Sequence, residues 1–287
     1  MPIAHVNGTA LHYHVKGSGA PIVMIHPPLI TSAIFRYQQV QLSDEFKIIT
    51  FDIRGHGHSA HSDEPVTYPL IVSDIIALLD YLELPHAHLC GYSTGGSIVL
   101  EALLEAPTRF LSGVVAVGMS EARDWFLRGR IKGAELLSSP LLIRLLTLGV
   151  TFGNSDMGLT FKNLFKHARY GNIDNVRQYF GYSLDYNCTD RVHHIEHPLL
   201  LMYGQNDKRF EAYAEMILQR LPHAKRAVIR DAGHYLFTKD AGKTNEVLRA
   251  WYRHAENVLH GKPRPYVAEA SPLMPAEDVQ EPVHPNV

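Results

Sequence analysis

The feature that most constrains the fold of this 287-residue chain is a glycine-rich turn, Gly91-Tyr92-Ser93-Thr94-Gly95-Gly96. Before it, residues 87–92 form a short apolar run typical of a buried strand, and after it a helical pattern continues to about Ala106. Glycines on both sides of Ser93 allow a sharp turn in which the helix and the neighbouring strands approach closely. The sequence therefore predicts a strand–turn–helix unit with a serine at the turn.

Strand-like and helix-like segments alternate along most of the chain, which predicts an α/β fold with a mostly parallel sheet. Val6-Asn7-Gly8-Thr9 predicts a tight hairpin turn between two N-terminal strands. Residues 70–84 keep helical spacing of apolar side chains, and Pro85 ends that segment. Further strands are expected at residues 22–25, 47–51, 111–117, 198–203 and 226–229, and further helices at residues 210–221 and 247–258.

The alternation is interrupted between residues 120 and 190, where apolar helix-like stretches rich in Leu and Phe replace the strand-like runs. We predict a helical insertion there, within a core formed by residues 1–119 and 191–260. Most apolar residues of the insertion must pack the insertion itself, but some should face a cleft and create a largely apolar pocket. Residues 261–287 are rich in proline and poor in large apolar side chains, which predicts a flexible tail.

Composition excludes several classes of partner. The formal net charge is −2 and no block of basic residues occurs, so we expect no nucleic-acid partner. The longest apolar stretch, residues 136–150, is too short and too polar to span a bilayer, so no membrane association is expected. No secretory signal is evident, and two cysteines, Cys90 and Cys188, are most consistent with reduced thiols in a cytoplasmic setting. Nothing in the sequence indicates an oligomeric state.

Three residues are candidates for nucleophilic catalysis. A serine hydroxyl is a weak nucleophile at neutral pH, so it needs a base, and the base needs an orienting carboxylate. Asp207 and His234 each follow an expected strand and would lie beyond the carboxyl ends of a parallel sheet, where such sheets place ligands. We predict Ser93 as nucleophile, His234 as base and Asp207 as acid, with Asp124 as the second choice for the acid.

The chain has 18 histidines, so a histidine alone predicts little. Two groups of three lie close together in the sequence, but neither has cysteine or acidic ligands at a recognised metal-binding spacing. We therefore expect neither a metal nor a cofactor. The two groups are His56, His58 and His61, and His193, His194 and His197.

Together these motifs resemble the α/β-hydrolase family, whose members carry Ser, Asp and His in this order around a G-x-S-x-G elbow. Asp52-Ile53-Arg54-Gly55-His56-Gly57-His58-Ser59 is similar to the family's D-x-R-G-x-G-x-S loop, and Ile25-His26 is similar to the histidine that opens its oxyanion loop. The resemblance covers roughly residues 1–260 and implies an eight-stranded sheet with a helical cap after the sixth strand. Ser93 distinguishes the chain from the related haloalkane dehalogenases and epoxide hydrolases, which place Asp at the elbow.

The oxyanion loop departs from the family pattern. The family usually reads His-Gly-x, with the N–H of x as a donor, whereas this chain reads His26-Pro27-Pro28-Leu29, and Pro28 has no N–H. The backbone N–H of Thr94 can supply one donor to a developing oxyanion. We expect the second from the backbone N–H of Leu29, with the side chain of Thr31, or no second donor, as alternatives.

The function predicted from these motifs is that of a cofactor-free serine hydrolase. It would cleave a carboxylic ester or lactone with apolar groups through an acyl-enzyme. Two alternatives are enzymatic: Tyr92-Ser93-Thr94-Gly95-Gly96 is similar to the elbow of cofactor-free haloperoxidases (perhydrolases), and carbon–carbon bond hydrolases share the capped fold. A third alternative is a slow-turnover signalling receptor of the hydrolase fold, which only the Pro27-Pro28 departure favours.

Overall fold

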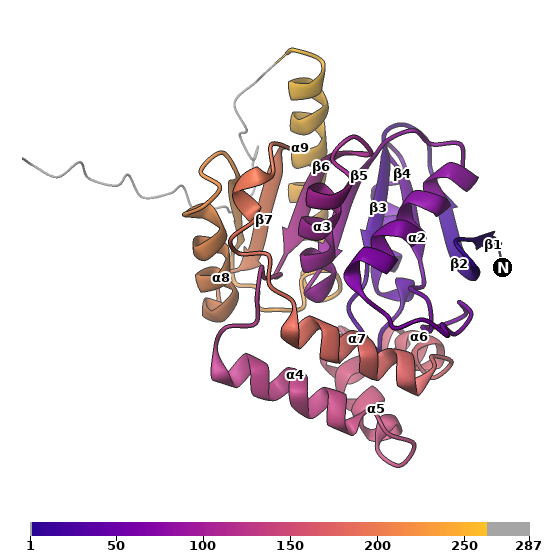
Figure 1. The fold of residues 1–287 in the computed structure, drawn as a ribbon. Coiled ribbons are helices and arrows are strands. Elements are labelled where there is room, and N and C mark those ends of the chain that lie inside the picture. Colours follow the sequence, from indigo (N-terminus) through magenta and orange to yellow (C-terminus); the bar gives the residue numbers. More distant parts are fainter. Residues whose placement is uncertain (1, 263–287) are drawn as a thin grey trace, which may run out of the picture.

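The computed structural model describes residues 2–262 of the chain. Its centre is an eight-stranded sheet with the strand order β1-β2-β4-β3-β5-β6-β7-β8 (Figure 1). The pairings of β1 with β2 and of β2 with β4 are antiparallel, and all the others are parallel. The prediction of a mostly parallel eight-stranded sheet is therefore confirmed. The strands are β1 (Ile3–Val6), β2 (Thr9–Lys16), β3 (Pro21–Ile25), β4 (Lys47–Phe51), β5 (Ala87–Tyr92), β6 (Phe110–Ala116), β7 (Leu199–Gly204) and β8 (Lys225–Ile229).

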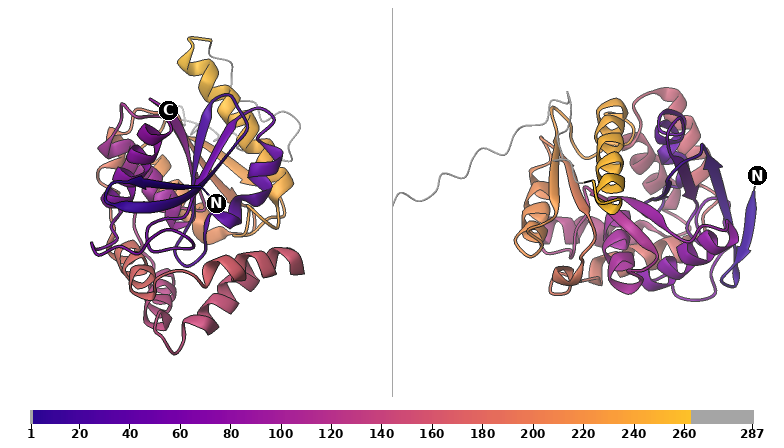
Figure 2. Two further views of the ribbon diagram at one scale, coloured as in Figure 1. Left: turned by 90° about the vertical axis from the view of Figure 1, so that its right-hand side faces the viewer. Right: turned by 90° about the horizontal axis from the view of Figure 1, so that it is seen from above.

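Helices cover both faces of this sheet, so that its central strands are buried on both sides (Figures 1 and 2). Helices α2 and α3 pack against each other on one face, and α9 packs with α1 on the other. The helices of the core are α1 (Arg36–Gln41), α2 (Tyr68–Tyr81), α3 (Thr94–Glu105), α8 (Lys208–Leu218) and α9 (Ala241–Leu259), with the short 3-10 turns η1 (Ser32–Phe35) and η2 (Val192–His194).

Local sequence explains where these elements begin and turn. At the N-terminal hairpin, Asn7 and Gly8 both have positive φ angles of 46° and 69°, as a two-residue turn of this kind requires. Helix α2 begins at Tyr68 because the Thr67 side chain accepts the N–H of Leu70. The helix ends at residue 81, before the predicted end at residue 84, because residue 83 adopts a left-handed backbone with a φ of 56°.

Between β6 and β7 the described chain forms four α-helices, which lie below the sheet in Figure 1. Helix α4 packs along α7, and α5 packs along α6. We refer to these four as the inserted helices. They are α4 (Trp125–Leu137), α5 (Ile143–Gly153), α6 (Gly158–Ala168) and α7 (Ile173–Asp185).

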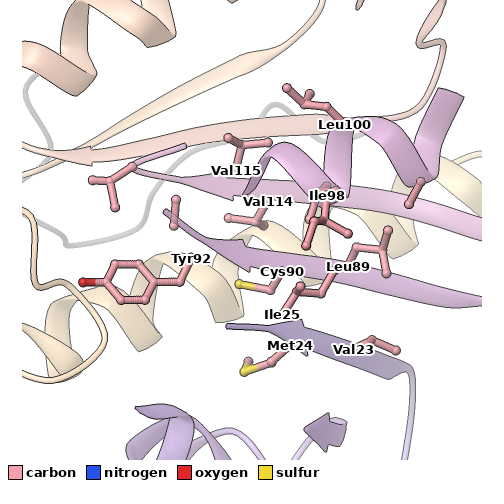
Figure 3. Packing of buried hydrophobic residues seen from close by; sticks show 14 of the residues in the cluster. Val23, Met24, Ile25, Leu89, Cys90, Tyr92, Ile98, Leu100, Val114 and Val115 are labelled. Carbon is pink, nitrogen blue, oxygen red and sulfur yellow. The ribbon is translucent and has the colours of Figure 1, made fainter. Parts of the chain in front are cut away.

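The core lies between the sheet and its flanking helices. Met24 of β3, Cys90 of β5 and Val114 of β6 lie opposite one another in the parallel register, so their side chains share one face of the sheet, and Figure 3 shows them on three neighbouring strands. Cys90 belongs to the same cluster, and burial raises the pKa of its thiol to about 12, which leaves it unreactive. Cys90 and Cys188 are both buried free cysteines.

Two further expectations concern the membrane and the tail. Among residues 2–262, no helix has both the length and the apolar character needed to cross a bilayer. The predicted flexible tail lies outside the described residues from position 263 onward.

Candidate active site

Ser93 lies at the tight turn between β5 and α3, where the sequence predicted it. Its φ of 55° and ψ of −121° place it in a strained backbone region that non-glycine residues rarely adopt. The neighbouring glycines are required by close packing. A Cβ atom on Gly91 would lie 2.1 Å from the Gly95 carbonyl oxygen, and one on Gly95 would lie 2.2 Å from the Ile25 carbonyl oxygen. The local sequence thus produces a turn that only small residues allow.

Asp207 and His234 lie together because the loops after β7 and β8 are joined through their backbones. The N–H of Asn206 donates to the carbonyl of Ala232 over 2.9 Å. A Cβ atom on Gly204 would lie 2.3 Å from the Gly233 carbonyl oxygen, so glycine is needed where the two loops meet. The result is a 2.9 Å hydrogen bond from Nδ1 of His234 to Oδ2 of Asp207.

This hydrogen bond engages one ring nitrogen of His234 and leaves Nε2 for a second partner. The ring packs against Phe210, with 4.7 Å between centroids, and against Tyr92, with 5.8 Å. In the described structure, the Ser93 hydroxyl makes no hydrogen bond to His234, although both side chains line the same cavity. Such contacts are often long in ligand-free enzymes and shorten only when substrate binds.

That cavity has a volume of about 540 Å³ and lies between the sheet edge and the inserted helices. Helices α4 and α5 supply much of its wall, and most of the lining side chains are apolar. The sequence predicted an apolar pocket beneath the insertion but did not identify its residues. They are Pro27, Pro28, Ile30, Tyr92, Ser93, Thr94, Met119, Leu127, Arg130, Ile131, Ala134, Leu137, Leu145, Leu146, Gly149, Val150, Asn154, Phe180, Phe210, His234 and Tyr235.

The expected oxyanion donors differ in their placement. Thr94 lines the cavity, and its backbone N–H is at the start of α3, beside the positive end of the helix dipole. Leu29 has a φ of 72° and a buried side chain, and its neighbours Pro28 and Ile30 line the cavity whereas Leu29 itself does not. Within residues 2–262, neither of these two N–H groups donates a hydrogen bond to the protein. Thr31, the alternative donor, instead caps η1 by accepting the N–H of Ala33.

The loop that carries Pro27 and Pro28 is held by His26. Nε2 of His26 accepts the N–H of Ile53 over 2.9 Å, so the ring proton is on Nδ1, which donates to the Pro27 carbonyl over 2.8 Å. Burial lowers the pKa of His26, which keeps the ring neutral. The Tyr179 hydroxyl of α7 donates to the carbonyl of His26 over 3.0 Å. Helix α7 is thereby tied to the proline loop, a contact that no sequence pattern indicated.

The Asp52–Ser59 loop is held in place by hydrogen bonds to buried polar side chains. Burial opposes ionisation of Asp52, but hydrogen bonds from His12, from the backbone of His58 and from Ser32 hold the pKa of the Asp52 carboxyl below its usual range. Arg54 forms a bidentate ion pair with the buried carboxylate of Asp74, with N–O distances of 2.7 and 2.6 Å.

The second-choice acid, Asp124, lies elsewhere. Its carboxylate accepts the N–H of Leu127 at the start of α4 and binds Arg209 and the Tyr213 hydroxyl. The structure therefore pairs His234 with Asp207 and uses Asp124 as a helix cap. In the described part of the chain, no group of three or more His, Cys, Asp or Glu side chains is arranged to hold a metal ion.

Comparisons with known proteins agree with this architecture. The chain is 26% identical over 266 residues to the dihydrolipoyllysine-residue acetyltransferase component of the acetoin cleaving system of Pseudomonas putida, covering 87% of this chain and 68% of that protein. It is 32% identical over 142 residues to 3-oxoadipate enol-lactonase 2 of Acinetobacter baylyi, covering 46% of this chain and 53% of the lactonase. The second match therefore spans about half of the relative's length.

Solved structures and a family model extend these matches. An esterase from Exiguobacterium antarcticum has the same fold, with a TM-score of 0.79 at 21% sequence identity, covering 88% of this chain and 98% of that one. The model of the alpha/beta hydrolase fold family matches residues 20–241, which is most of the chain. The chain therefore belongs to the alpha/beta hydrolase fold family, and it is an enzyme of the hydrolase class.

Proposed function

We propose that this enzyme cleaves a carboxylic ester or lactone with apolar groups, using Ser93, His234 and Asp207. One observation carries the proposal: an imidazole bound to a carboxylate over 2.9 Å lines the same cavity as a serine in a strained elbow. These are the parts that serine hydrolysis needs, namely a nucleophile, a base and a group that orients the base.

The reaction would proceed in two halves. The Ser93 hydroxyl oxygen attacks the carbonyl carbon while Nε2 of His234 takes the hydroxyl proton, and the negative charge moves to the carbonyl oxygen. Collapse of this intermediate breaks the carbon–oxygen bond, and the leaving alkoxide takes the proton from His234. A water molecule then attacks the acyl-enzyme with His234 again as base, which releases the acid and restores Ser93. Asp207 stabilises the imidazolium formed in each half.

The oxyanion would be bound by backbone N–H groups. Thr94 is the first donor, because its N–H lies at the start of a helix beside Ser93 and donates to no group in the described part of the chain. Leu29 is the second, because its left-handed backbone follows the proline loop and its N–H has no partner among residues 2–262. His26 and Tyr179 hold this loop in place and so support the Leu29 donor indirectly.

The class of substrate is supported by the cavity. Its wall is mainly apolar, which favours substrates that bury hydrocarbon over highly polar ones. The names of two similar proteins, an enol-lactonase and an esterase, point to the same chemistry.

The test is a Ser93→Ala variant assayed with short-chain 4-nitrophenyl esters. We expect kcat/KM to fall at least about 1000-fold, because the nucleophile is lost. Ser97→Ala is the matched control: Ser97 lies in the same helix but donates to the Met119 carbonyl and is absent from the cavity wall. A fluorophosphonate should phosphonylate Ser93 in the unaltered protein with loss of fluoride, which raises the mass of the Ser93 peptide by that of the phosphonyl group. Unchanged hydrolysis by Ser93→Ala would disprove the proposal.

A further inference from the structure

Arg130 is an exception in the wall of the active-site cavity. The lining residues include no aspartate or glutamate, and apart from His234 the only titratable cation among them is Arg130. It projects from the face of α4 that borders the cavity, where its neighbours are apolar. That face comprises Leu127, Arg130, Ile131, Ala134 and Leu137, at the spacing of one side of a helix.

The neighbouring cations of α4 have evident structural partners. Arg128 donates to the carbonyls of Ala122 and Leu184 over 3.1 and 3.0 Å. Lys132 pairs with Glu135 over 2.9 Å. Arg130 forms neither an ion pair nor a hydrogen bond with any residue of the described chain, so its charge serves no contact that holds the helices together.

Two other polar side chains of the cavity wall, Tyr92 and Asn154, are engaged with the protein. The Tyr92 hydroxyl donates to Asn154, and the Asn154 amide nitrogen donates to the Val150 carbonyl. The guanidinium of Arg130 is the donor in this wall that carries a fixed positive charge, and it is exposed at the edge of a mainly apolar space. Guanidinium groups bind carboxylates through two parallel hydrogen bonds, so a carboxylate is the complementary ligand.

We propose that the substrate is an ester or lactone whose apolar chain ends in a carboxylate, and that Arg130 binds this carboxylate. The inference rests on the proposed hydrolytic function and specifies its substrate class. The acyl chain would lie along the apolar wall between Ser93 and α4, with the reacting carbonyl at one end and the anionic group at the other. The contact between Arg130 and the carboxylate would position the reacting carbonyl next to Ser93, and Arg130 would take no part in the bond-breaking steps.

The experiment compares two esters that differ in charge, 4-nitrophenyl hydrogen adipate and methyl 4-nitrophenyl adipate, with 4-nitrophenol release as the signal. The quantity measured is the ratio of kcat/KM for the acid over that for its methyl ester. We expect the unaltered enzyme to prefer the acid, and Arg130→Gln to lower the ratio about 10-fold through KM, as loss of one charge-assisted pair implies. The corresponding monoesters of glutarate, pimelate and suberate would locate the best chain length.

Arg144→Gln is the matched control. Arg144 is an exposed arginine of the adjacent helix α5, it lies outside the cavity wall, and its replacement removes the same charge from the inserted helices. We expect it to leave the ratio unchanged. Added salt should lower the preference of the unaltered enzyme, since Arg130 is exposed. Arg130→Lys, which keeps the charge but not the planar fork, should give an intermediate ratio.

The outcomes separate the inference from the proposed function. If neither ester is hydrolysed in a Ser93-dependent manner, the proposed function fails. If both are hydrolysed but the ratio is near one, or if Arg130→Gln and Arg144→Gln change it equally, the carboxylate site is wrong while the hydrolase stands. Free adipate offers a second measurement, because it should inhibit the unaltered enzyme more strongly than the Arg130→Gln variant.

Discussion

The hydroxyl of Tyr92 donates a buried 2.9 Å hydrogen bond to Oδ1 of Asn154. Tyr92 is the residue before Ser93, at the end of β5 in Figure 3, and Asn154 is the C-cap residue that directly follows helix α5. The Asn154 side chain is fixed in turn, because its nitrogen donates to the Val150 carbonyl. An inserted helix is thereby attached directly to the strand that carries the proposed nucleophile.

A second contact at the end of α5 reaches the base. A Cβ atom on Gly153 would lie 2.7 Å from the Tyr235 hydroxyl, so only glycine fits there without movement. Tyr235 follows His234 in the chain. The end of α5 therefore contacts neighbours of both proposed catalytic residues, and its position should affect how the cavity holds a substrate.

Tyr92→Phe tests this attachment, because it removes the hydrogen bond and keeps the ring. A buried hydrogen bond of this kind contributes about 0.5–1.5 kcal/mol, so we expect KM for ester substrates to rise about 2- to 10-fold, with a smaller change in kcat. Tyr37→Phe is the control: Tyr37 donates to Asp156 over 2.6 Å, a bond to the inserted segment outside the active-site cavity. Equal effects of the two variants on KM would show that Tyr92 has only a structural role.

Asp207→Asn tests the role of the carboxylate paired with His234. The amide has a similar shape but cannot stabilise an imidazolium, and it permits the wrong ring tautomer, so we expect kcat to fall about 10⁴-fold with little change in KM. Asp124→Asn is the matched comparison, because Asp124 was the second choice from sequence and caps α4 in the structure. A drop in kcat for Asp124→Asn as large as that for Asp207→Asn would contradict the assignment.

The parts of the site that could be predicted from sequence are those that depend on local patterns. The turn at Ser93 follows from glycines between a strand run and a helix run, and Asp207 and His234 each follow a strand whose carboxyl end must lie at the same sheet edge. Because parallel strands end at the same edge of the sheet, residues that follow different strands in the sequence come close together in space. No knowledge of how the inserted helices pack was required.

The remainder of the site depends on that packing. Arg130 and Tyr179 belong to inserted helices and Asn154 caps one of them, and only the docking of these helices brings the three residues to the cavity or to His26. The helical spacing places Arg130 on the same side of α4 as several apolar residues. The spacing alone does not show which side of the helix borders the cavity. The short helices η1 and α1 were missed because segments of four and six residues show little periodicity.

His56 should make the fold sensitive to acid. Burial lowers its pKa from 6.5 to about 3, and the neighbouring His26 acts in the same direction. Above pH 6.5 the imidazole is neutral in both states, but below it the unfolded chain binds a proton that the folded chain excludes. The free energy of unfolding should therefore decrease as pH falls from 6.5 towards about 3, and this loss should level off below that pH.

Urea unfolding at about pH 7.5 and about pH 4.5 checks this. Each pH unit between the two pKa values corresponds to about 1.4 kcal/mol, so His56 accounts for at most about 2–3 kcal/mol of the loss at the lower pH. His56→Gln should reduce the difference between the two pH values. His61→Gln, which replaces an exposed histidine nearby in the sequence, should not. An identical acid response in both variants would rule out His56 as the cause.

Two glycine-to-alanine substitutions should have opposite effects on stability. In Gly95→Ala the new methyl group would lie 2.2 Å from the Ile25 carbonyl oxygen, and because this is backbone, β3 or the elbow must move. We expect a loss of about 2–3 kcal/mol in unfolding free energy and a large loss of hydrolysis. Gly129 is exposed within α4 and a Cβ atom there would meet nothing within 4 Å, so Gly129→Ala should stabilise by up to about 1 kcal/mol. Denaturant unfolding and activity assays on both variants make the comparison. If the Gly95→Ala protein is as stable and as active as Gly129→Ala, the elbow does not need the close approach of α3 to β3.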